Sequence, residues 1–414
     1  MEFKKLGEIA DILISNVDKK TKENEYPVKL CNFVDVYYNW SISSYHYQNL
    51  MNATATKQEI DKFSIREGDV AITKDSETRD DIGVSTYISE SLKNTLLGYH
   101  CVLIRPNKNV ILGKYLNIVL HSSYAQKYFE ANAGGSGQRY TLKDTIIKDM
   151  LIPIPSIEEQ EQLGNLANSI DKKIENNNKI NAKLESLAKT IYDYWFLQFE
   201  FPNEEGKPYK SSGGKMVWNE ELKREIPEGW RKGSLSDICS ITMGASPNGE
   251  SLNENQNGLI FYQGKADFSF RFPSIRMFTT SPIRYAKKND VLISVRAPVG
   301  DLNIANNDCC IGRGLAALHS SYPSYLYYKM VSSKNLFSYY NQNGTTFGAV
   351  TKENLHNLEI VVPNEKTIML FEKTISPLDK KISILSQENQ ELSSLRDFLL
   401  PMLMNGQISF SDDI

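Results

Sequence analysis

The sequence predicts an α+β protein in which two mixed α/β blocks alternate with two long helices. Two observations support this prediction. A stretch that begins at Pro155 recurs without a gap at Pro363, 208 residues later. Short β-like runs separated by turn residues fill the segment in front of each copy. A duplicated helix preceded each time by a globular block implies a pseudo-two-fold molecule with two similar but unequal surfaces.

The repeated stretches are PSIEEQEQLGNLANSIDKKI and PNEKTIMLFEKTISPLDKKI. Apolar residues recur through both at steps of three and four, which is a heptad seam that needs a partner helix. The other copy is the nearest partner, so we expect an antiparallel coiled coil, with ordinary helix packing as the alternative. Asn181 and Asn389 match, and a buried Asn commonly fixes register. The expected pairing residues are Ile170, Ile174, Asn181, Leu184, Leu187, Leu378, Ile382, Asn389, Leu392 and Leu395.

The two blocks match each other faintly. Glu67-Gly68-Asp69-Val70 resembles Lys288-Asn289-Asp290-Val291, and the Gly-rich loop 135–140 resembles 344–349. The offset falls from 229 residues at the start of the blocks to 208 at the helices, so the first block is about 21 residues longer. A shared framework with divergent loops is typical of two readers of different targets. Between them, the Pro- and Gly-rich linker is expected to break regular structure.

Charge is distributed unevenly along the chain. Residues 231–362 carry 13 Lys and Arg against 9 Asp and Glu, residues 1–154 carry 19 of each, and the remainder carries 15 against 22. An extended anionic ligand would therefore prefer the blocks to the helices. The five cysteines are odd in number and form no CxxC pair, and the sequence shows no signal peptide or membrane-spanning run. We therefore expect a cytoplasmic protein without a disulfide framework.

Motifs that would signal catalysis are missing from the sequence. There is no GxGxxG after a strand and no GxxxxGK[ST], so no nucleotide cradle is predicted. The five histidines form no HExxH pair, and the Asn-Pro-Pro-aromatic signature of DNA amino-methyltransferases does not occur. We therefore expect no catalytic residue, and no bound metal or cofactor, in this chain.

Residues suited to DNA lie on the loops of both blocks. Arg and Gln can donate to or pair with guanine and adenine edges, whereas Lys, Ser and Thr suit phosphates. A solvated surface charge or an ordinary turn is the alternative interpretation of each residue. The candidates are Lys74, Arg79, Ser136, Gln138, Arg139 and Tyr140 in the first block and Arg296, Arg313, Thr345, Thr346 and Lys352 in the second.

Several stretches resemble the specificity (S) subunit of type I restriction–modification systems. IPIPSIEEQ (152–160) is similar to that family's entry into its central conserved helix. AKTIYDYWF (188–196) and IPEGW (226–230) are similar to the exit from this helix and the lead into the second target-recognition domain. LLPMLMNGQI (399–408) resembles the family's C-terminus. One departure is the start of the second helix, where Pro363-Asn364-Glu365-Lys366 lacks the Glu-Gln pair of the first copy, which would weaken a helix cap or a subunit contact.

The resemblance covers the whole chain and implies a division into five segments. They are a target-recognition domain at 1–154, a central conserved helix at 155–200, a linker at 201–230, a second target-recognition domain at 231–362, and a C-terminal conserved helix and tail at 363–414. Each domain would recognise one half of a bipartite, asymmetric site in double-stranded DNA. The paired helices would set the gap between the halves and dock two methyltransferase (M) subunits.

The resemblance also assigns the cofactors to partner subunits. S-adenosylmethionine would bind the methyltransferase subunits, and restriction (R) subunits would bring ATP and Mg. Two other functions stay open at this point. One is a self-contained DNA adenine methyltransferase, and the other is a coiled-coil scaffold that binds no DNA.

Overall fold

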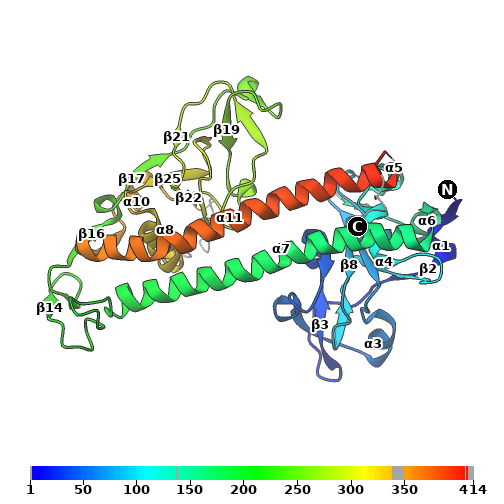
Figure 1. The fold of residues 1–414 in the computed structure, drawn as a ribbon, viewed down its shortest axis with the longest axis horizontal. Helices are drawn as coiled ribbons and strands as arrows, with labels where there is room; N and C mark the ends of the chain where they lie inside the picture. Colours follow the sequence, from blue (N-terminus) through cyan, green and yellow to red (C-terminus); the bar gives the residue numbers. More distant parts are fainter. Residues whose placement is uncertain (1, 137–138, 338–348, 406, 409–414) are drawn as a thin grey trace. The chain divides into compact units, whose positions relative to one another are not determined.

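The computed structural model divides the chain into two compact units (Figure 1). Unit 1 comprises residues 1–176 and 389–414, and unit 2 comprises residues 177–388. Each unit therefore combines one α/β block with part of both long helices. The structure describes residues 2–136, 139–337, 349–405 and 407–408.

The framework of unit 1 is a five-stranded sheet in the order β2-β10-β6-β8-β4. Its neighbours are antiparallel except for the parallel pair β4 and β8. Alternate residues of β6 enter different cores, since Val70 and Ile72 pack in the core that contains helix α4 while Ala71 packs in the core that contains helix α2. The elements are β2 (Ala10–Ile14), β4 (Ser41–Ile42), β6 (Val70–Thr73), β8 (Ser85–Ile88), β10 (Cys101–Pro106), α1 (Leu6–Ile9), α2 (Phe33–Tyr38), α4 (Gly113–Leu120), α5 (Ser123–Asn132) and α6 (Asp144–Asp149).

The framework of unit 2 repeats this sheet with the order β17-β25-β22-β23. In both units an antiparallel pair joins the first and last strands of the block, β1 with β13 and β16 with β26. The chain therefore enters each long helix beside the point at which the block begins. The elements are β1 (Glu2–Lys5), β13 (Leu151–Ile154), β16 (Arg231–Ser234), β17 (Ser240–Met243), β22 (Val291–Ser294), β23 (Leu302–Ile304), β25 (Leu315–His319), β26 (Glu359–Val362), α8 (Pro323–Ser332) and α10 (Lys352–His356).

A second sheet in each block has a shared centre and different edges. In unit 1 the order is β5-β3-β9, and in unit 2 it is β18-β20-β19-β24-β21. The central strands β3 and β19 each pair with one antiparallel and one parallel neighbour. The extra edge strands of unit 2 show where the duplicated blocks diverge. The elements are β3 (Tyr26–Cys31), β5 (Met51–Ala55), α3 (Lys57–Phe63), β9 (Thr95–Leu97), β18 (Leu252–Asn253), β19 (Leu259–Tyr262), β20 (Met277–Thr279), β21 (Tyr285–Ala286) and β24 (Cys309–Ile311).

The turn before β6 and β22 explains the repeated Gly-Asp-Val and Asn-Asp-Val triplets. Gly68 and Asn289 have φ of 94° and 74°, a left-handed conformation that Gly and Asn adopt most readily. The buried carboxylate of Asp69 accepts from Arg105 of β10 at 2.8 Å. The carboxylate of Asp290 lies 2.6 Å from His319 of β25. The framework motif thus ties one turn to a neighbouring strand in both units.

The two long helices are α7 (Ile157–Tyr192), continued by a π-helical turn over Asp193–Leu197, and α11 (Glu365–Met404). Ser156 and Glu159 form a capping box at the start of α7. The start of α11 is also capped, since the side chain of Asn364 accepts from the backbone N–H of Thr367 at 2.9 Å. Among the described residues, neither these helices nor the shorter ones are long and apolar enough to cross a membrane.

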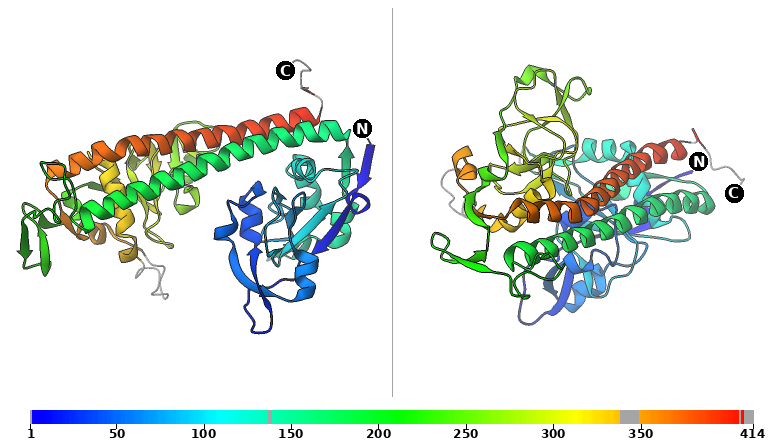
Figure 2. Two further views of the ribbon diagram at one scale, coloured as in Figure 1. Left: turned by 60° about the horizontal axis from the view of Figure 1, so that its bottom comes forward. Right: turned by 60° about the vertical axis from the view of Figure 1, so that its left-hand side comes forward.

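The helices pair in antiparallel fashion within each unit (Figure 2). In unit 2 the rings of Tyr192 and Phe371 lie 5.7 Å apart, and the amide of Asn181 donates to Ser386 at 3.3 Å. In unit 1 Leu163 and Leu400 share one core. Ile170, Asn181 and Ile382 are buried, while a further group of predicted pairing residues is partly buried. That group is Ile174, Leu184, Leu378, Asn389 and Leu392.

Two of the predicted pairing residues lie outside the seam. Leu187 is 49% exposed and Leu395 is 46% exposed. The 4-3 alternation continues through Ala188 and Arg396, which lie four residues after Leu184 and Leu392 and take the inward positions. Because a helix has 3.6 residues per turn, a second consecutive step of three places Leu187 and Leu395 outside the seam.

The linker contains regular structure, unlike the expectation from its composition. Strands β14 (Met216–Asn219) and β15 (Arg224–Pro227) form an antiparallel hairpin in unit 2. Beside it, Phe201 stacks between the rings of Tyr209 at 4.5 Å and Trp230 at 5.1 Å. Aromatic burial therefore offsets the effect of the Pro and Gly residues in this segment.

Candidate DNA interface and the clamps behind it

Unit 1 brings four of its predicted DNA residues together on or beside one small sheet. This sheet has the order β11-β12-β7 and is formed by Gly134–Ser136, Arg139–Thr141 and Asp75–Ser76. Tyr140 pairs with Ser76 across it. Lys74, Arg79, Arg139 and Tyr140 are thereby gathered from two distant parts of the sequence. Ser136 pairs with Arg139 through its backbone, and Gln138 lies outside the described residues.

The arginines of this sheet are held by specific contacts. The guanidinium of Arg79 lies 5.4 Å from the ring centroid of Tyr140, and its Nη2 donates to the carbonyl of Ala133 at 3.3 Å. Nη2 of Arg139 lies 3.4 Å from the carboxylate of Asp75. Both arginines are exposed, so their remaining N–H groups are available to a ligand.

His100 completes this arrangement and was not predicted from the sequence. Its Nδ1 lies 2.5 Å from Oδ2 of Asp75, and its Nε2 lies 3.0 Å from Nη2 of Arg139. Burial would raise the pKa of Asp75, but the hydrogen bonds from Thr141 and His100 and the charges of Lys74 and Arg139 outweigh this and lower it. Asp75 is therefore a carboxylate at neutral pH. An isolated His in the sequence carries no signal for such a role.

An open pocket of about 550 Å³ lies beside this sheet. One wall is formed by aromatic and aliphatic residues of α2, and the other by Asp75, Arg139 and the segment that follows β7. The hydroxyl of Tyr37 donates to Asp81 at 2.8 Å, and burial followed by this contact raises the pKa of Tyr37 to about 12. The pocket therefore has a flat apolar side and a charged side.

Unit 2 repeats the backbone hydrogen bonding around β7. At the equivalent position it has a residue of opposite charge. In unit 1 the carbonyl of Lys74 accepts from Leu142, and in unit 2 the carbonyl of Val295 accepts from Val350, both at 2.9 Å. The next residues are Asp75, which pairs with Thr141, and Arg296, which bridges to Ala349. Asp75 and Arg296 therefore occupy equivalent positions, and the two blocks present different chemistry at the same point.

The remaining candidates of unit 2 are spread around Arg296. Nε of Arg313 donates to Oγ of Ser246 at 3.2 Å. Lys352 is exposed at the start of α10, whose first turn is capped by Thr351. Thr345 and Thr346 lie outside the described residues. Arg296 and Arg313 thus lie on loops of this block, and Lys352 lies at the start of a helix.

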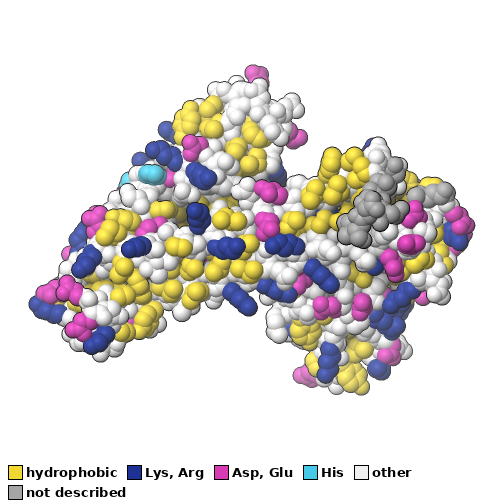
Figure 3. Space-filling model, in the orientation of Figure 1, with side chains coloured by type: hydrophobic (Ala, Val, Ile, Leu, Met, Phe, Trp, Pro, Cys, Tyr) yellow, Lys and Arg dark blue, Asp and Glu magenta, His cyan; other side chains and the backbone are white. Residues whose placement is uncertain are grey.

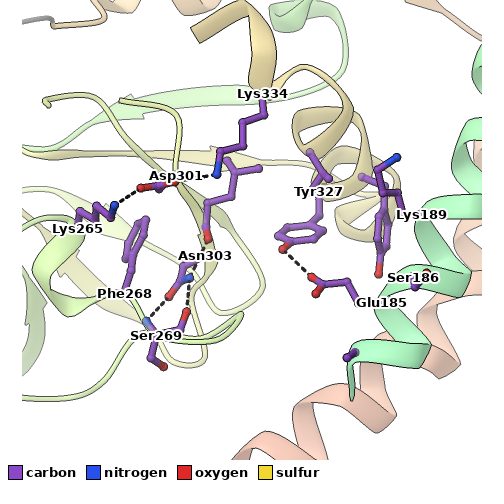
Figure 4. Close-up of a pocket in the computed structure, with 14 residues that line it drawn as sticks. Glu185, Ser186, Lys189, Lys265, Phe268, Ser269, Asp301, Asn303, Tyr327 and Lys334 are labelled. Carbon is purple, nitrogen blue, oxygen red and sulfur yellow. Dashed lines mark hydrogen bonds and ion pairs between the residues drawn. The ribbon is translucent and has the colours of Figure 1, made fainter. Parts of the chain in front are cut away.

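A buried arginine fixes the block of unit 2 to the helices. The Arg271 side chain is 1% exposed and lies 2.5 Å from Asp379 of α11 and 3.3 Å from Glu185 of α7. Its guanidinium lies 3.7 Å from the ring centroid of Tyr327. Figure 4 shows the hydroxyl of Tyr327 pointing toward Glu185, to which it donates at 3.3 Å. One guanidinium therefore forms an ion pair with a carboxylate on each helix.

The contacts that fix a block to the helices form a clamp. In the clamp of unit 1 the cation lies on the helix. Arg396 of α11 lies 3.9 Å from the ring centroid of Trp40, and Asp171 of α7 accepts from Ser41. Burial raises the pKa of Asp171, although the contact with Ser41 and the charge of Arg396 oppose the rise. Asp171 and Asp379 are equivalent residues of the repeated Asp-Lys-Lys-Ile. Each contacts the block that precedes its own helix, which accounts for the repetition of this acid.

The folds of the units and their shared frame define an internally duplicated protein with two divergent recognition blocks on a helix pair. The family model for the type I restriction modification DNA specificity domain matches residues 1–186 and 227–394. The chain belongs to this family of DNA specificity subunits. Each matched region contains one recognition domain and most of a long helix.

Individual relatives agree with this assignment. The MjaX protein of Methanocaldococcus jannaschii, whose name describes it as a type I restriction enzyme specificity subunit, is 28% identical over 98% of this chain and 93% of its own length. The HindI specificity subunit of Haemophilus influenzae is 22% identical over 97% and 98%. The crystal structure of a type I restriction-modification S subunit from M. genitalium has a TM-score of 0.53 at 16% identity, over 96% of this chain and 94% of that one. This last similarity concerns the fold.

Proposed function

We propose that each recognition domain binds one half of a bipartite, asymmetric DNA site and that the chain itself performs no chemistry. The observation that carries this proposal is the equivalence of Asp75 and Arg296 on a shared backbone frame. A duplicated scaffold with opposite charges at one position suits two different half-sites. A protein that only tethers partners needs no such divergence.

In this proposal the helices set the distance between the half-sites. A helix of 36 residues such as α7 is about 54 Å long at 1.5 Å per residue. Half-sites about 34 Å apart, one turn of DNA, would allow both domains to face the same side of the duplex. The buried Asn181 would fix the register of the helix pair, and the clamps around Arg271 and Arg396 would fix each domain on it.

The helices would also dock two methyltransferase subunits in the cytoplasm. Support comes from Leu187 and Leu395, which are exposed at equivalent positions 208 residues apart. Figure 3 shows hydrophobic side chains beside Lys and Arg on the exposed surface of the helices, a composition that suits a protein partner. The methyltransferase subunits would bring S-adenosylmethionine for the methylation of adenine, and restriction subunits would bring ATP and Mg.

Methylome sequencing of cells with and without the gene tests this function. A bipartite motif methylated on adenine should disappear on deletion and return on complementation. Exchanging residues 1–150 for the corresponding block of a relative should change one half of the motif and leave the other half and the gap unchanged. A methylome that is the same with and without the gene would reject the proposal.

A further inference from the structure

The pocket beside β7 and β12 carries more acid than base. The segment 74–81 contains two cations and four carboxylates. Asp75, Glu77 and Asp81 line the pocket, with Arg139 and His100 as its basic residues. An excess of carboxylates repels phosphates, so this pocket does not suit the DNA backbone. Carboxylates do suit one feature of DNA, the N4 amino group of cytosine, which donates a hydrogen bond into the major groove.

Arg139 is both exposed and oriented. Its side chain is 56% exposed, while Nη2 lies 3.4 Å from Asp75 and 3.0 Å from Nε2 of His100. An arginine held at one end loses less side-chain entropy when its other N–H groups bind a ligand. Guanine presents O6 and N7 in the major groove, which is the pair of acceptors that an arginine fork matches best.

The second wall of the pocket is apolar and unusually exposed. Tyr38 is 78% exposed and Val34 is 55% exposed, both on α2. The rings of Phe33 and Tyr37, which also line the pocket, stack at a centroid distance of 5.7 Å. An exposed aromatic wall facing a polar one suits the edge of a flat, partly apolar group such as a base pair. The pocket volume of about 550 Å³ leaves room for that edge.

We propose that this pocket reads one G·C base pair of the first half-site in the major groove. Arg139 donates to O6 and N7 of guanine, and Glu77 accepts from N4 of the paired cytosine. Asp75 and His100 are positioning residues for Arg139. This inference rests on the proposed function and deepens it, because it names the base pair and the residues that select it. In unit 2 the equivalent of Asp75 is Arg296, so the second domain selects a different base pair at this position.

A chemical substitution in the DNA tests the guanine contact. The purified complex with its methyltransferase subunits is titrated with duplexes that carry 7-deazaguanine, which lacks N7, at one position of the first half-site at a time. The native complex should lose affinity at a single position, on the order of tenfold. The complex with Arg139→Ala should bind more weakly overall and show no further loss at that position. Equal losses for the native and the Arg139→Ala complexes at every position would overturn the proposal.

The methylome provides the complementary test of both residues. Arg139→Ala and Glu77→Ala should each relax the same single position of the first half-site and leave the second half-site unchanged. Lys57→Ala is the matched control, since Lys57 is exposed on α3 and paired with Asp61, and its motif should not change. A positioning role for His100 predicts that His100→Ala weakens discrimination at that position while Arg139 still responds to 7-deazaguanine.

Two other outcomes separate the alternatives. Weaker subunit assembly, with the remaining methylation still confined to the native motif, would identify the pocket as a protein-docking site and overturn the proposal. A failure of the proposed function itself has a different signature, since the native gene would then produce no bipartite motif. If the methylated motif is unchanged in the Arg139→Ala and Glu77→Ala variants, this inference alone is rejected.

Discussion

Trp40 and Arg271 occupy the same backbone position in the two units. The carbonyl of Trp40 accepts from Tyr87 at 3.0 Å and that of Arg271 accepts from Ile304 at 2.8 Å. Tyr87 and Ile304 in turn pair with Val70 and Val291, the first residues of β6 and β22. In unit 1 the domain presents an aromatic ring to an arginine of the helix, whereas in unit 2 the domain presents the arginine and the helices present carboxylates. The duplicated fold therefore keeps an arginine between domain and helices while the arginine changes sides.

Removal of Arg271 should destabilise unit 2 strongly. Arg271→Ala leaves Asp379 and Glu185 partly buried without their cation, and breaking a buried ion pair costs about 3–5 kcal/mol. Amide hydrogen exchange should become faster in β22 and remain unchanged in β6. Arg231→Ala is the control, because Arg231 is 58% exposed in its pair with Asp237 and should cost below about 1 kcal/mol. Equal protection of β22 in both variants would contradict the clamp.

Unit 1 should lose stability in mild acid through His121. Burial, followed by the charge of Arg396, lowers the pKa of His121 to about 3, whereas the unfolded chain has a His pKa near 6.5. The folded state is therefore the state that binds fewer protons, and its stability falls as pH drops from about 6.5 toward 3. Because part of the His121 side chain is exposed to solvent, the loss should stay well below the limit of about 1.4 kcal/mol per pH unit.

His121→Gln isolates this contribution. The variant retains a polar side chain near Ser85, whose Oγ lies 3.0 Å from Nδ1 of His121, but it cannot be protonated. Denaturant unfolding of unit 1, followed between pH 7 and pH 4, should show a smaller decrease in the free energy of unfolding for the variant. Parallel curves for the two proteins would show that His121 is protonated equally in both states.

The framework turns predict which substitutions at Gly68 are tolerated. Gly68 has φ of 94°, and an added Cβ would lie 3.2 Å from Cε of Lys108, the flexible end of a side chain. The equivalent residue of unit 2 is Asn289 with φ of 74°. Gly68→Asn should therefore cost about 1 kcal/mol or less, whereas Gly68→Val should cost about 1–3 kcal/mol because a β-branched residue resists this conformation. Thermal unfolding compares the two directly, and equal costs would argue against conformational strain.

Much of the architecture is visible in the sequence because it is repeated locally. Three features lie in segments that align without gaps. They are the seams, the match between Asp171 and Asp379, and the turns at Gly68 and Asn289. The clamps are not visible, because Trp40 and Arg271 lie in divergent segments and meet α11 only through the tertiary fold. His100 was missed for the same reason. The candidates around β7 were found because the Gly-rich loop marks the hairpin, but their acidic surroundings become clear only when two distant segments meet.

The exposed leucines provide the sharpest test of the docking role. A second consecutive step of three assigns Leu187 and Leu395 to the helix pair, whereas both are about half exposed. Leu187→Asp and Leu395→Asp should therefore leave the free subunit as stable as the native one. If the leucines anchor methyltransferase subunits, each variant should lose affinity for one of the two subunits by at least about tenfold, as expected for a central apolar contact. Light scattering of the assembled complex should then give one bound methyltransferase subunit for each single variant and none for the double variant.

Lys183→Asp is the control for this prediction. It changes the charge of an exposed α7 residue outside the leucine positions and should retain both subunits. Full assembly of the double variant would place the docking surface elsewhere on the chain.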